Sequence, residues 1–269
     1  MTTAEEPIIE LEGATKRFLS GRGDVHVAVS DLNLTIQPGE FIAVVGPTGC
    51  GKSTTLSLVS GLEPASAGIV RVAGKDVTGI PDRIGYMFQA DALMPWRTVL
   101  GNVSAGLKWR GDGDEATEKA LDWIARVGLK GFENYYPHQL SGGMRKRVAL
   151  AQVLVTEPHI LLMDEPFSSL DVQTRSLMQD ELLRLWQGSG TAVVFVTHDL
   201  EEAITLSDRV VVMTASPARI KDIFPIPLPR PREVEELRVQ PEFIELYKHI
   251  WSCLSEEVAI AREEVARVG

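Results

Sequence analysis

The chain has 269 residues, and its 27 lysines and arginines against 37 aspartates and glutamates give a formal net charge of −10. This length suits one large domain or a domain with an appendage, and the acidic balance argues against a nucleic-acid binder that relies on a basic surface. Two cysteines make a poor disulfide framework and favour a reducing compartment, while the acidic N-terminus and the short apolar runs predict neither a signal peptide nor a membrane-spanning helix.

The strand patterns fall into two classes. Residues near 8–11, 32–36 and 69–72 alternate apolar and polar side chains between turn signals such as "QPGE", which indicates a small antiparallel sheet. Other runs are almost continuously apolar, as expected for strands buried on both faces. These runs are "FIAVV" (41–45), "HILLM" (159–163), "AVVFVT" (192–197) and "RVVVM" (209–213). Because helical stretches separate them, they predict a parallel sheet covered on both sides.

The middle of the chain has a helical pattern. From Gln89 to about Pro158 there is little strand character, and "EATEKALDWIARVGL" has apolar residues near helical spacing. We therefore expect a helical subdomain at about 90–158, inserted into a domain that spans 1–215.

The remaining residues, 216–269, form the predicted C-terminal extension. The stretch "FPIPLPRPRE" carries four prolines, which remove backbone donors and predict an extended segment at the surface. Apolar residues then recur at helical spacing, namely Phe243, Tyr247, Ile250, Leu254 and Val258. Their common face either covers the domain itself or contacts a partner or regulator.

The segment "GPTGCGKST" (46–54) follows the first buried strand and opens a helix, which is the context of a phosphate-binding loop. Its glycines let backbone N–H groups point at phosphate oxygens, and the helix N-terminus adds partial positive charge. Lys52 should reach the β- and γ-phosphates, and the Ser53 hydroxyl should ligate Mg²⁺. The alternative is an ordinary glycine-rich turn. The expected nucleotide contacts are Gly46, Pro47, Thr48, Gly49, Cys50, Gly51, Lys52, Ser53 and Thr54.

Polar side chains follow other strands of the predicted parallel sheet. Asp164 would hold Mg²⁺ through its water shell, and Glu165 would orient or deprotonate the attacking water. His198 would contact the γ-phosphate, and Gln89 would contact Mg²⁺ or the water. A charged helix start and a structural histidine are the alternatives, so these assignments depend on the phosphate loop upstream.

The segment "LSGGM" indicates a second, incomplete anion site. Ser141 is typical of a helix N-cap, and Gly142 and Gly143 would leave the first amides uncovered. This helix start has neither a lysine anchor nor a metal ligand. We therefore expect it to close over the nucleotide of a second copy, so that a two-fold dimer encloses two ATP molecules. A plain helix cap is the alternative.

Together, "GPTGCGKST", Gln89, "LSGGM", "ILLMDEP", "SSLD" and "TH" (197–198) resemble the ATP-binding cassette family in order and approximate spacing, over roughly 7–215. The resemblance implies an α/β P-loop NTPase (RecA-like) core with a small antiparallel β subdomain and an inserted helical subdomain, which hydrolyses ATP as a dimer. Asp171 would communicate between the two sites. Phe18 in "TKRF" looks like the aromatic that stacks on adenine, with a core or edge-strand aromatic as the alternative.

The stretches "QADALMPWRTVLGNV" (89–103) and "PIPLPRPRE" are similar to those of nitrate, sulfonate/taurine and bicarbonate importer ATPases. That resemblance implies a homodimer or a pair with a paralogous ATPase, separate transmembrane permease subunits and an extracytoplasmic solute-binding protein, with the ATPase at the cytoplasmic face of the membrane. Met144 and Gln152 depart from the wider family, although this importer group often has Met at the former position.

Two other functions compete with transport. An ATP-switched protein acting on nucleic acid or ribosomes usually has tandem cassettes or a long coiled-coil insertion, and this sequence shows neither. A small-molecule kinase would share the phosphate loop but would not explain "LSGGM". We therefore expect no nucleic-acid partner. The transported solute is not encoded in these motifs.

Overall fold

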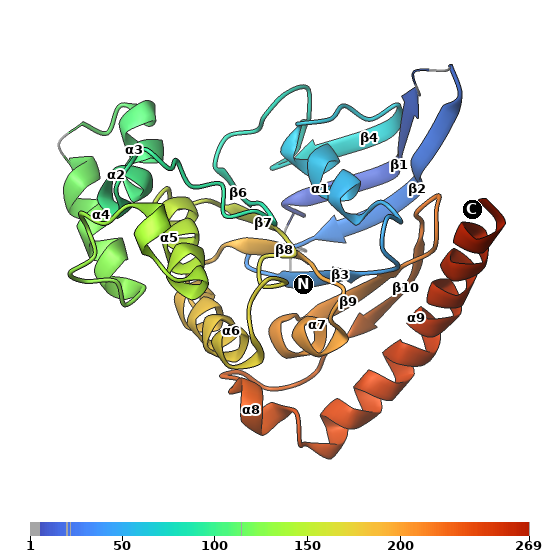
Figure 1. Ribbon diagram of the computed structural model, residues 1–269. Coiled ribbons are helices and arrows are strands. Elements are labelled where there is room, and N and C mark those ends of the chain that lie inside the picture. The colour runs from blue at the N-terminus through green and yellow to red at the C-terminus, as the bar shows by residue number, and fades with distance from the viewer. Residues whose placement is uncertain (1–5, 20, 22, 114, 269) are drawn as a thin grey trace, which may run out of the picture.

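In the part of the chain that the computed structural model describes, residues 6–19, 21, 23–113 and 115–268, the strands form two sheets (Figure 1). The larger sheet has the order β10-β9-β3-β8-β7-β6, in which β10 pairs antiparallel with β9 and the other neighbours are parallel. Its strands are β3 (Phe41–Val45), β6 (Ile84–Met87), β7 (Ile160–Asp164), β8 (Ala192–Val196), β9 (Arg209–Met213) and β10 (Ile220–Pro225). The predicted parallel sheet is confirmed, with strand ends within one residue of those expected.

The apolar runs have a simple cause, since both faces of this sheet are covered. Ile42 and Val44 of β3 pack in a cluster with the smaller sheet and α1 (Lys52–Ser60), whereas Phe41 packs with the helices on the opposite face. Every residue of β3 and of β8 is buried. The sheet therefore holds the loops at its carboxyl edge on a rigid base.

The smaller sheet is antiparallel, with the order β2-β1-β4-β5. Its strands are β1 (Ile9–Leu19), β2 (Val25–Ile36), β4 (Ala67–Val72) and β5 (Lys75–Asp76). The predicted lengths were wrong, because β1 and β2 extend well beyond the alternating segments. Leu19 at the end of β1 and Val25 at the start of β2 are exposed, and the pairing of β1 with β2 shifts register near Gly13. In this part of the two strands, apolar and polar residues therefore do not alternate in a regular pattern that the sequence could reveal.

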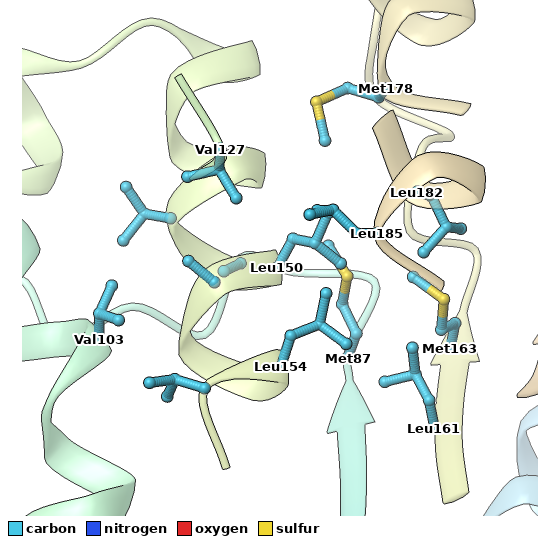
Figure 2. Close-up of a cluster of buried hydrophobic side chains, with 14 of the residues drawn as sticks. Met87, Val103, Val127, Leu150, Leu154, Leu161, Met163, Met178, Leu182 and Leu185 are labelled. Atoms are coloured by element: carbon cyan, nitrogen blue, oxygen red, sulfur yellow. The ribbon is translucent and has the colours of Figure 1, made fainter. Parts of the chain in front are cut away.

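The helical insert is confirmed and lies to one side of the larger sheet (Figure 1, green). It contains α2 (Val99–Val103), α3 (Ala105–Arg110), α4 (Glu115–Arg126), a 3-10 turn (Pro137–Gln139) and α5 (Gly142–Leu154). Figure 2 shows the buried side chains that join it to the sheet: Leu150 and Leu154 of α5 lie near Met87 of β6, and Leu150 lies near Leu185 of α6 (Val172–Trp186). The insert therefore shares a core with the sheet.

The C-terminal region continues the same fold. Beyond β10 the chain is extended and its prolines are exposed, as expected, but Ile226 and Leu228 between them are buried. The expected extended surface segment is therefore confirmed for the prolines, whereas the two apolar side chains that alternate with them face the core. The strand β10 lies past residue 215, where the sequence analysis ended the first domain.

The last helix, α9 (Pro241–Val268), follows α8 (Val234–Leu237) and packs against α7 (Leu200–Leu206) and β9 (Figure 1). Phe243, Ile250 and Leu254 are buried in a cluster with these elements, and Tyr247 and Val258 pack at its margin. The predicted apolar face thus covers its own domain. Residues 1–5 and Gly269 lie outside the described residues, and within the described part of the chain no helix is long and apolar enough to cross a membrane.

Candidate functional site

A cleft of about 460 Å³ lies at the carboxyl edge of the parallel strands. The lining residues come from the loops after β3, β6, β7 and β8 and from the first turn of α1, at the edge where an open α/β sheet binds ligands. They are Thr48, Gly49, Gly51, Lys52, Ser53, Thr54, Gln89, Glu165 and His198. The structure therefore brings together the predicted phosphate loop and the three predicted catalytic residues.

In the loop between β3 and α1, two glycines let the backbone lie very close to neighbouring atoms. A Cβ on Gly46 would lie 3.0 Å from the Cys50 Sγ, and a Cβ on Gly51 would lie 2.7 Å from the Ala28 carbonyl oxygen. Gly51 also has a φ of 126°, which is strained for other residues. As the N-cap of α1, glycine offers no side chain to the first amides of the helix, so these remain available to an anion.

Lys52 is buried in this loop. Its Nζ donates hydrogen bonds of 2.9 Å to the carbonyl oxygens of Gly46 and Pro47. The ammonium group therefore lies over the curved backbone, where phosphate oxygens would be its competing acceptors. Burial raises the pKa of the neighbouring Cys50 thiol, so this side chain stays neutral.

Ser53 and Asp164 are in direct contact, since the Ser53 Oγ donates to the Asp164 Oδ1 at 3.0 Å. Burial, together with the charge of Glu165, raises the pKa of Asp164. The Asp164 carboxylate and the Ser53 hydroxyl are hard oxygen donors that lie side by side. Such a pair fits Mg²⁺ better than a softer metal.

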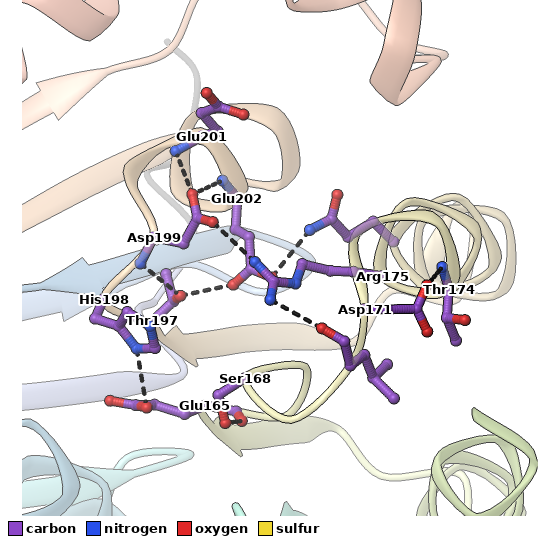
Figure 3. A network of polar contacts seen from close by, with 12 residues as sticks. Glu165, Ser168, Asp171, Thr174, Arg175, Thr197, His198, Asp199, Glu201 and Glu202 are labelled. Carbon is purple, nitrogen blue, oxygen red and sulfur yellow. Dashed lines mark hydrogen bonds and ion pairs between the residues drawn. The ribbon is translucent and has the colours of Figure 1, made fainter. Parts of the chain in front are cut away.

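Glu165 and His198 form a further polar contact of the cleft (Figure 3). The His198 Nδ1 lies 3.0 Å from the Glu165 Oε2, and the Glu165 amide donates to the Val196 carbonyl at 2.9 Å. Glu165 has a φ of 43°, which is strained for a residue with a Cβ, so the surrounding structure must hold this conformation. The carboxylate is thus fixed from both its backbone and its side chain.

The predicted second half-site, Ser141 to Gly143, lies outside the residues that line the cleft. Ser141 is the N-cap of α5, as predicted, and its Oγ accepts the Met144 amide at 3.2 Å, with Gly142 and Gly143 opening the helix. Gly143 approaches α6 closely, because a Cβ there would lie 2.8 Å from the Thr174 Cγ2. Ser141 and Gly142 are exposed.

Asp171 and Phe18 also lie outside the cleft lining. Asp171 is exposed and caps α6 by accepting the Thr174 amide at 3.0 Å, a hydrogen bond that lowers the pKa of Asp171. Phe18 on β1 is partly buried, packs against the cluster of the smaller sheet, and has the Lys16 Nζ 4.9 Å from its ring centroid. Phe18 thus packs against a core cluster, on a strand that lies between β2 and β4, and its stacking on adenine stays a prediction.

Sequence reasoning missed Lys146, which is 1% exposed. Its Nζ donates to the Gln89 carbonyl oxygen at 2.8 Å and lies 2.9 Å from the Asp91 Oδ1. The signal was present, since Lys146 stands four residues before Leu150 and eight before Leu154 on the buried face of α5. A charge on such a face requires a partner, and here the partner is the loop that carries Gln89.

Comparisons with known proteins agree with this geometry. Residues 29–168 match the family described as ABC transporter. An uncharacterised ABC transporter ATP-binding protein of Methanocaldococcus jannaschii is 48% identical over 251 residues, which are 93% of this chain and 92% of the relative. The aliphatic sulfonates import ATP-binding protein SsuB of Bacillus cereus is 40% identical, over 83% of this chain and 88% of the relative.

A solved structure shows the same fold. It is a dimeric, post-hydrolysis state of an ATP-binding cassette bound to ADP and Pi, with 31% identity and a TM-score of 0.72 over 81% of this chain and 98% of that one. The match of the family, the extent of the identities and the phosphate-loop cleft lead to one conclusion. This chain belongs to the ABC transporter family, as an ATP-binding subunit that hydrolyses ATP.

Proposed function

We propose that two copies of this subunit bind two ATP molecules between them and thereby drive the import of a small anionic or zwitterionic solute through separate permease subunits. The observation that carries the proposal is the division of the site: the cleft holds Lys52, Glu165 and His198, whereas Ser141 is exposed elsewhere on the same chain. The sulfonate-import relative supports import as the direction of transport and a sulfonate as a candidate solute. The resemblance of residues 89–103 to importer ATPases extends the candidates to nitrate, taurine and bicarbonate.

Within one chain, the cleft would bind the triphosphate and place a water. Lys52 would exchange its two carbonyl acceptors for phosphate oxygens, and Ser53 and Asp164 would hold Mg²⁺. The bound metal would neutralise charge on the β- and γ-phosphates. Glu165 would orient the attacking water and accept its proton, with His198 fixing the carboxylate and Gln89 closing the cleft beside it.

The second chain would complete each site. Ser141, Gly142 and Gly143 of one copy would meet the γ-phosphate in the cleft of the other, near Asp171. Because the γ-phosphate makes these contacts only in the closed dimer, ATP favours closure and hydrolysis favours separation. A permease bound to both copies would follow this movement at the cytoplasmic face of the membrane.

The test is Glu165→Gln, which keeps the size of the side chain but removes its ability to accept a proton. We expect retained ATP binding, turnover reduced by about a hundredfold or more, and a dimer in the presence of ATP. The measurements are steady-state phosphate release and light scattering after size-exclusion chromatography. The exposed Glu118→Gln is the control and should behave like the wild type.

A Glu165→Gln variant that turns over rapidly, or that stays monomeric with ATP, would contradict the proposal. The import role has a separate test. Co-expression with the permease and the solute-binding protein should give a complex whose ATP turnover rises when a sulfonate or nitrate is supplied outside, and an unchanged rate with every such solute would overturn that part.

A further inference from the structure

We propose that Arg175 is a positioning residue that ties the loop carrying Asp171 to the loop carrying His198. Contact with the second copy at Asp171 would then set the position of His198 beside the ATP. This inference rests on the proposed function, because it uses the roles proposed for Asp171 and His198.

Arg175 lies one turn into α6, and its guanidinium group reaches in two directions (Figure 3). One nitrogen, Nη2, donates to the carbonyl oxygen of Leu170 at 3.0 Å, directly before Asp171. The other, Nη1, donates to the Asp199 Oδ2 at 3.2 Å, directly after His198. Arg175 thus connects Leu170, next to Asp171, with Asp199, next to His198.

The loop that carries His198 is fixed on both sides of the histidine. Asp199 caps α7 by accepting the amides of Glu201 and Glu202 at 2.9 and 3.2 Å. The Asp199 amide donates to the Thr197 Oγ1 at 3.0 Å, and this hydroxyl donates to the Glu202 Oε2 at 2.6 Å. His198 is therefore held between two anchored neighbours, with its own ring on Glu165 (Figure 3).

Charge makes this connection depend on the arginine. Arg175 faces two carboxylates, Asp199 and the buried Glu202, whose Oε1 lies 3.8 Å from the arginine Nε and accepts the Gln179 amide at 3.0 Å. Burial, and next the charge of Asp199, raises the pKa of Glu202, whereas Arg175 opposes that rise. Without the cation, two carboxylates would lie close together with less compensation, and the loop between them would relax.

The shape of the side chain matters as much as its charge. A guanidinium group donates from fixed, diverging N–H groups, so it can hold Leu170 and Asp199 at once, whereas a lysine offers a single compact group. Asp171 itself is exposed, and its carboxylate is fixed by the Thr174 amide one residue before Arg175. A displacement of Asp171 by a second copy would therefore be passed to Asp199 through α6.

The test compares Arg175→Gln and Arg175→Lys in the full chain, measuring kcat, KM for ATP and the Hill coefficient. We expect Arg175→Gln to lower kcat by at least about tenfold, because misplacing a distant support by 1 Å can cost about a hundredfold. KM should stay within about twofold of the wild type, the Hill coefficient should approach one, and Arg175→Lys should recover part of kcat. The control is Arg184→Gln on the same helix, whose side chain is 59% exposed and pairs with Glu181; it should match the wild type.

A double-mutant cycle separates positioning from general stability. If Arg175 acts through Asp171, the loss in kcat for Asp171→Ala combined with Arg175→Gln should be close to that of one change alone, whereas Asp171→Ala combined with Arg184→Gln should be additive. Should Arg175→Gln fail to fold, Asp199→Asn breaks the same link, since asparagine keeps the helix cap but loses the charge. It should lower kcat without raising KM.

Three results would overturn the inference: additive losses in the Arg175 and Asp171 cycle, a kcat loss in Arg175→Gln that only matches its loss of folded protein by circular dichroism, or a wild-type kcat in Asp199→Asn. The proposed function fails in a different way. In that case Glu165→Gln would stay monomeric with ATP, whereas failure of this inference alone leaves that ATP-dependent dimer intact.

Discussion

The ammonium group of Lys146 is buried between α5 and the loop after β6. It contacts the Gln89 carbonyl oxygen and the Asp91 carboxylate, which also receives the Arg145 Nε at 3.1 Å. Arg145 donates in turn to the Leu140 carbonyl, next to Ser141. Two consecutive cations of α5 therefore connect the start of the proposed second half-site to the loop that enters the cleft.

We predict that Lys146→Met lowers the free energy of unfolding by about 2 kcal/mol while preserving the length of the side chain. The Gln89 carbonyl loses its Lys146 donor, and the partly buried Asp91 carboxylate keeps only the contact with Arg145. Urea denaturation measures the change. Lys119→Met is the control, since that lysine is 45% exposed and forms only an i,i+4 pair, so its loss should cost less than about 0.5 kcal/mol. Equal stabilities of the two variants would show that the buried contacts of Lys146 contribute nothing measurable.

The residues that the sequence could not assign are those whose contacts lie on distant segments of the chain, namely Lys146 and Arg175. The phosphate loop and the polar residues at strand ends are local patterns, so a short window of sequence contains all that is needed to expect them. Lys146 and Arg175 have partners 57 and 24 residues away, respectively, and only the folded chain brings these groups together.

At the scale of elements, α9 decides between the two interpretations of the C-terminal region. Its apolar face packs on α7, β9 and β10, and Glu257 accepts the Ala215 amide at 2.9 Å. The helix is therefore attached to the sheet by apolar and polar contacts, and its buried face is not open to a partner.

We predict that Ile250→Ala lowers the free energy of unfolding by about 3 kcal/mol, because Ile250 is fully buried and its loss leaves a cavity. The matched control on the same helix is Ile244→Ala, where the side chain is 42% exposed and the cost should stay below about 1 kcal/mol. Thermal and urea unfolding of the two variants provide the comparison. If Ile250→Ala unfolds like the wild type, α9 does not belong to the core.

The sequence predicted best the strands whose residue pattern has a single physical cause. Burial on both faces produced the apolar runs of β3, β7, β8 and β9, and their boundaries agree with the structure. The end of β1 and the start of β2 were missed, because these segments pair through their backbones while their side chains stay exposed. Apolar and polar residues therefore need not alternate there. The prolines around Ile226 indicated an extended chain, but the pattern could not show which side chains between them are buried.

At the scale of the whole molecule, one chain carries the two proposed parts of the ATP site at separate places. The cleft holds the phosphate loop and the proposed catalytic groups, and the exposed N-cap at Ser141 belongs to a helix of the insert. A two-fold dimer would pair each cleft with the opposite Ser141, so damage to one part of a chain would affect only one of the two sites. This arrangement can be tested without a structure of the dimer.

We predict that Lys52→Ala and Ser141→Arg are each inactive as homodimers but recover ATP turnover when mixed before ATP is added. One site of the mixed dimer combines both defects, and the other combines an intact cleft with an intact Ser141. Random mixing makes about half of the dimers mixed, so about a quarter of the wild-type rate is expected if the sites act independently. Phosphate release measures the recovery. As the control, Lys52→Ala mixed with Glu165→Gln should stay inactive, because both changes lie in the cleft and each site of that mixed dimer keeps one of them. No recovery in the first mixture would mean that each chain holds a complete site of its own. Recovery in the control mixture would mean that Lys52 and Glu165 do not serve the same cleft, and would overturn the proposed division of the site.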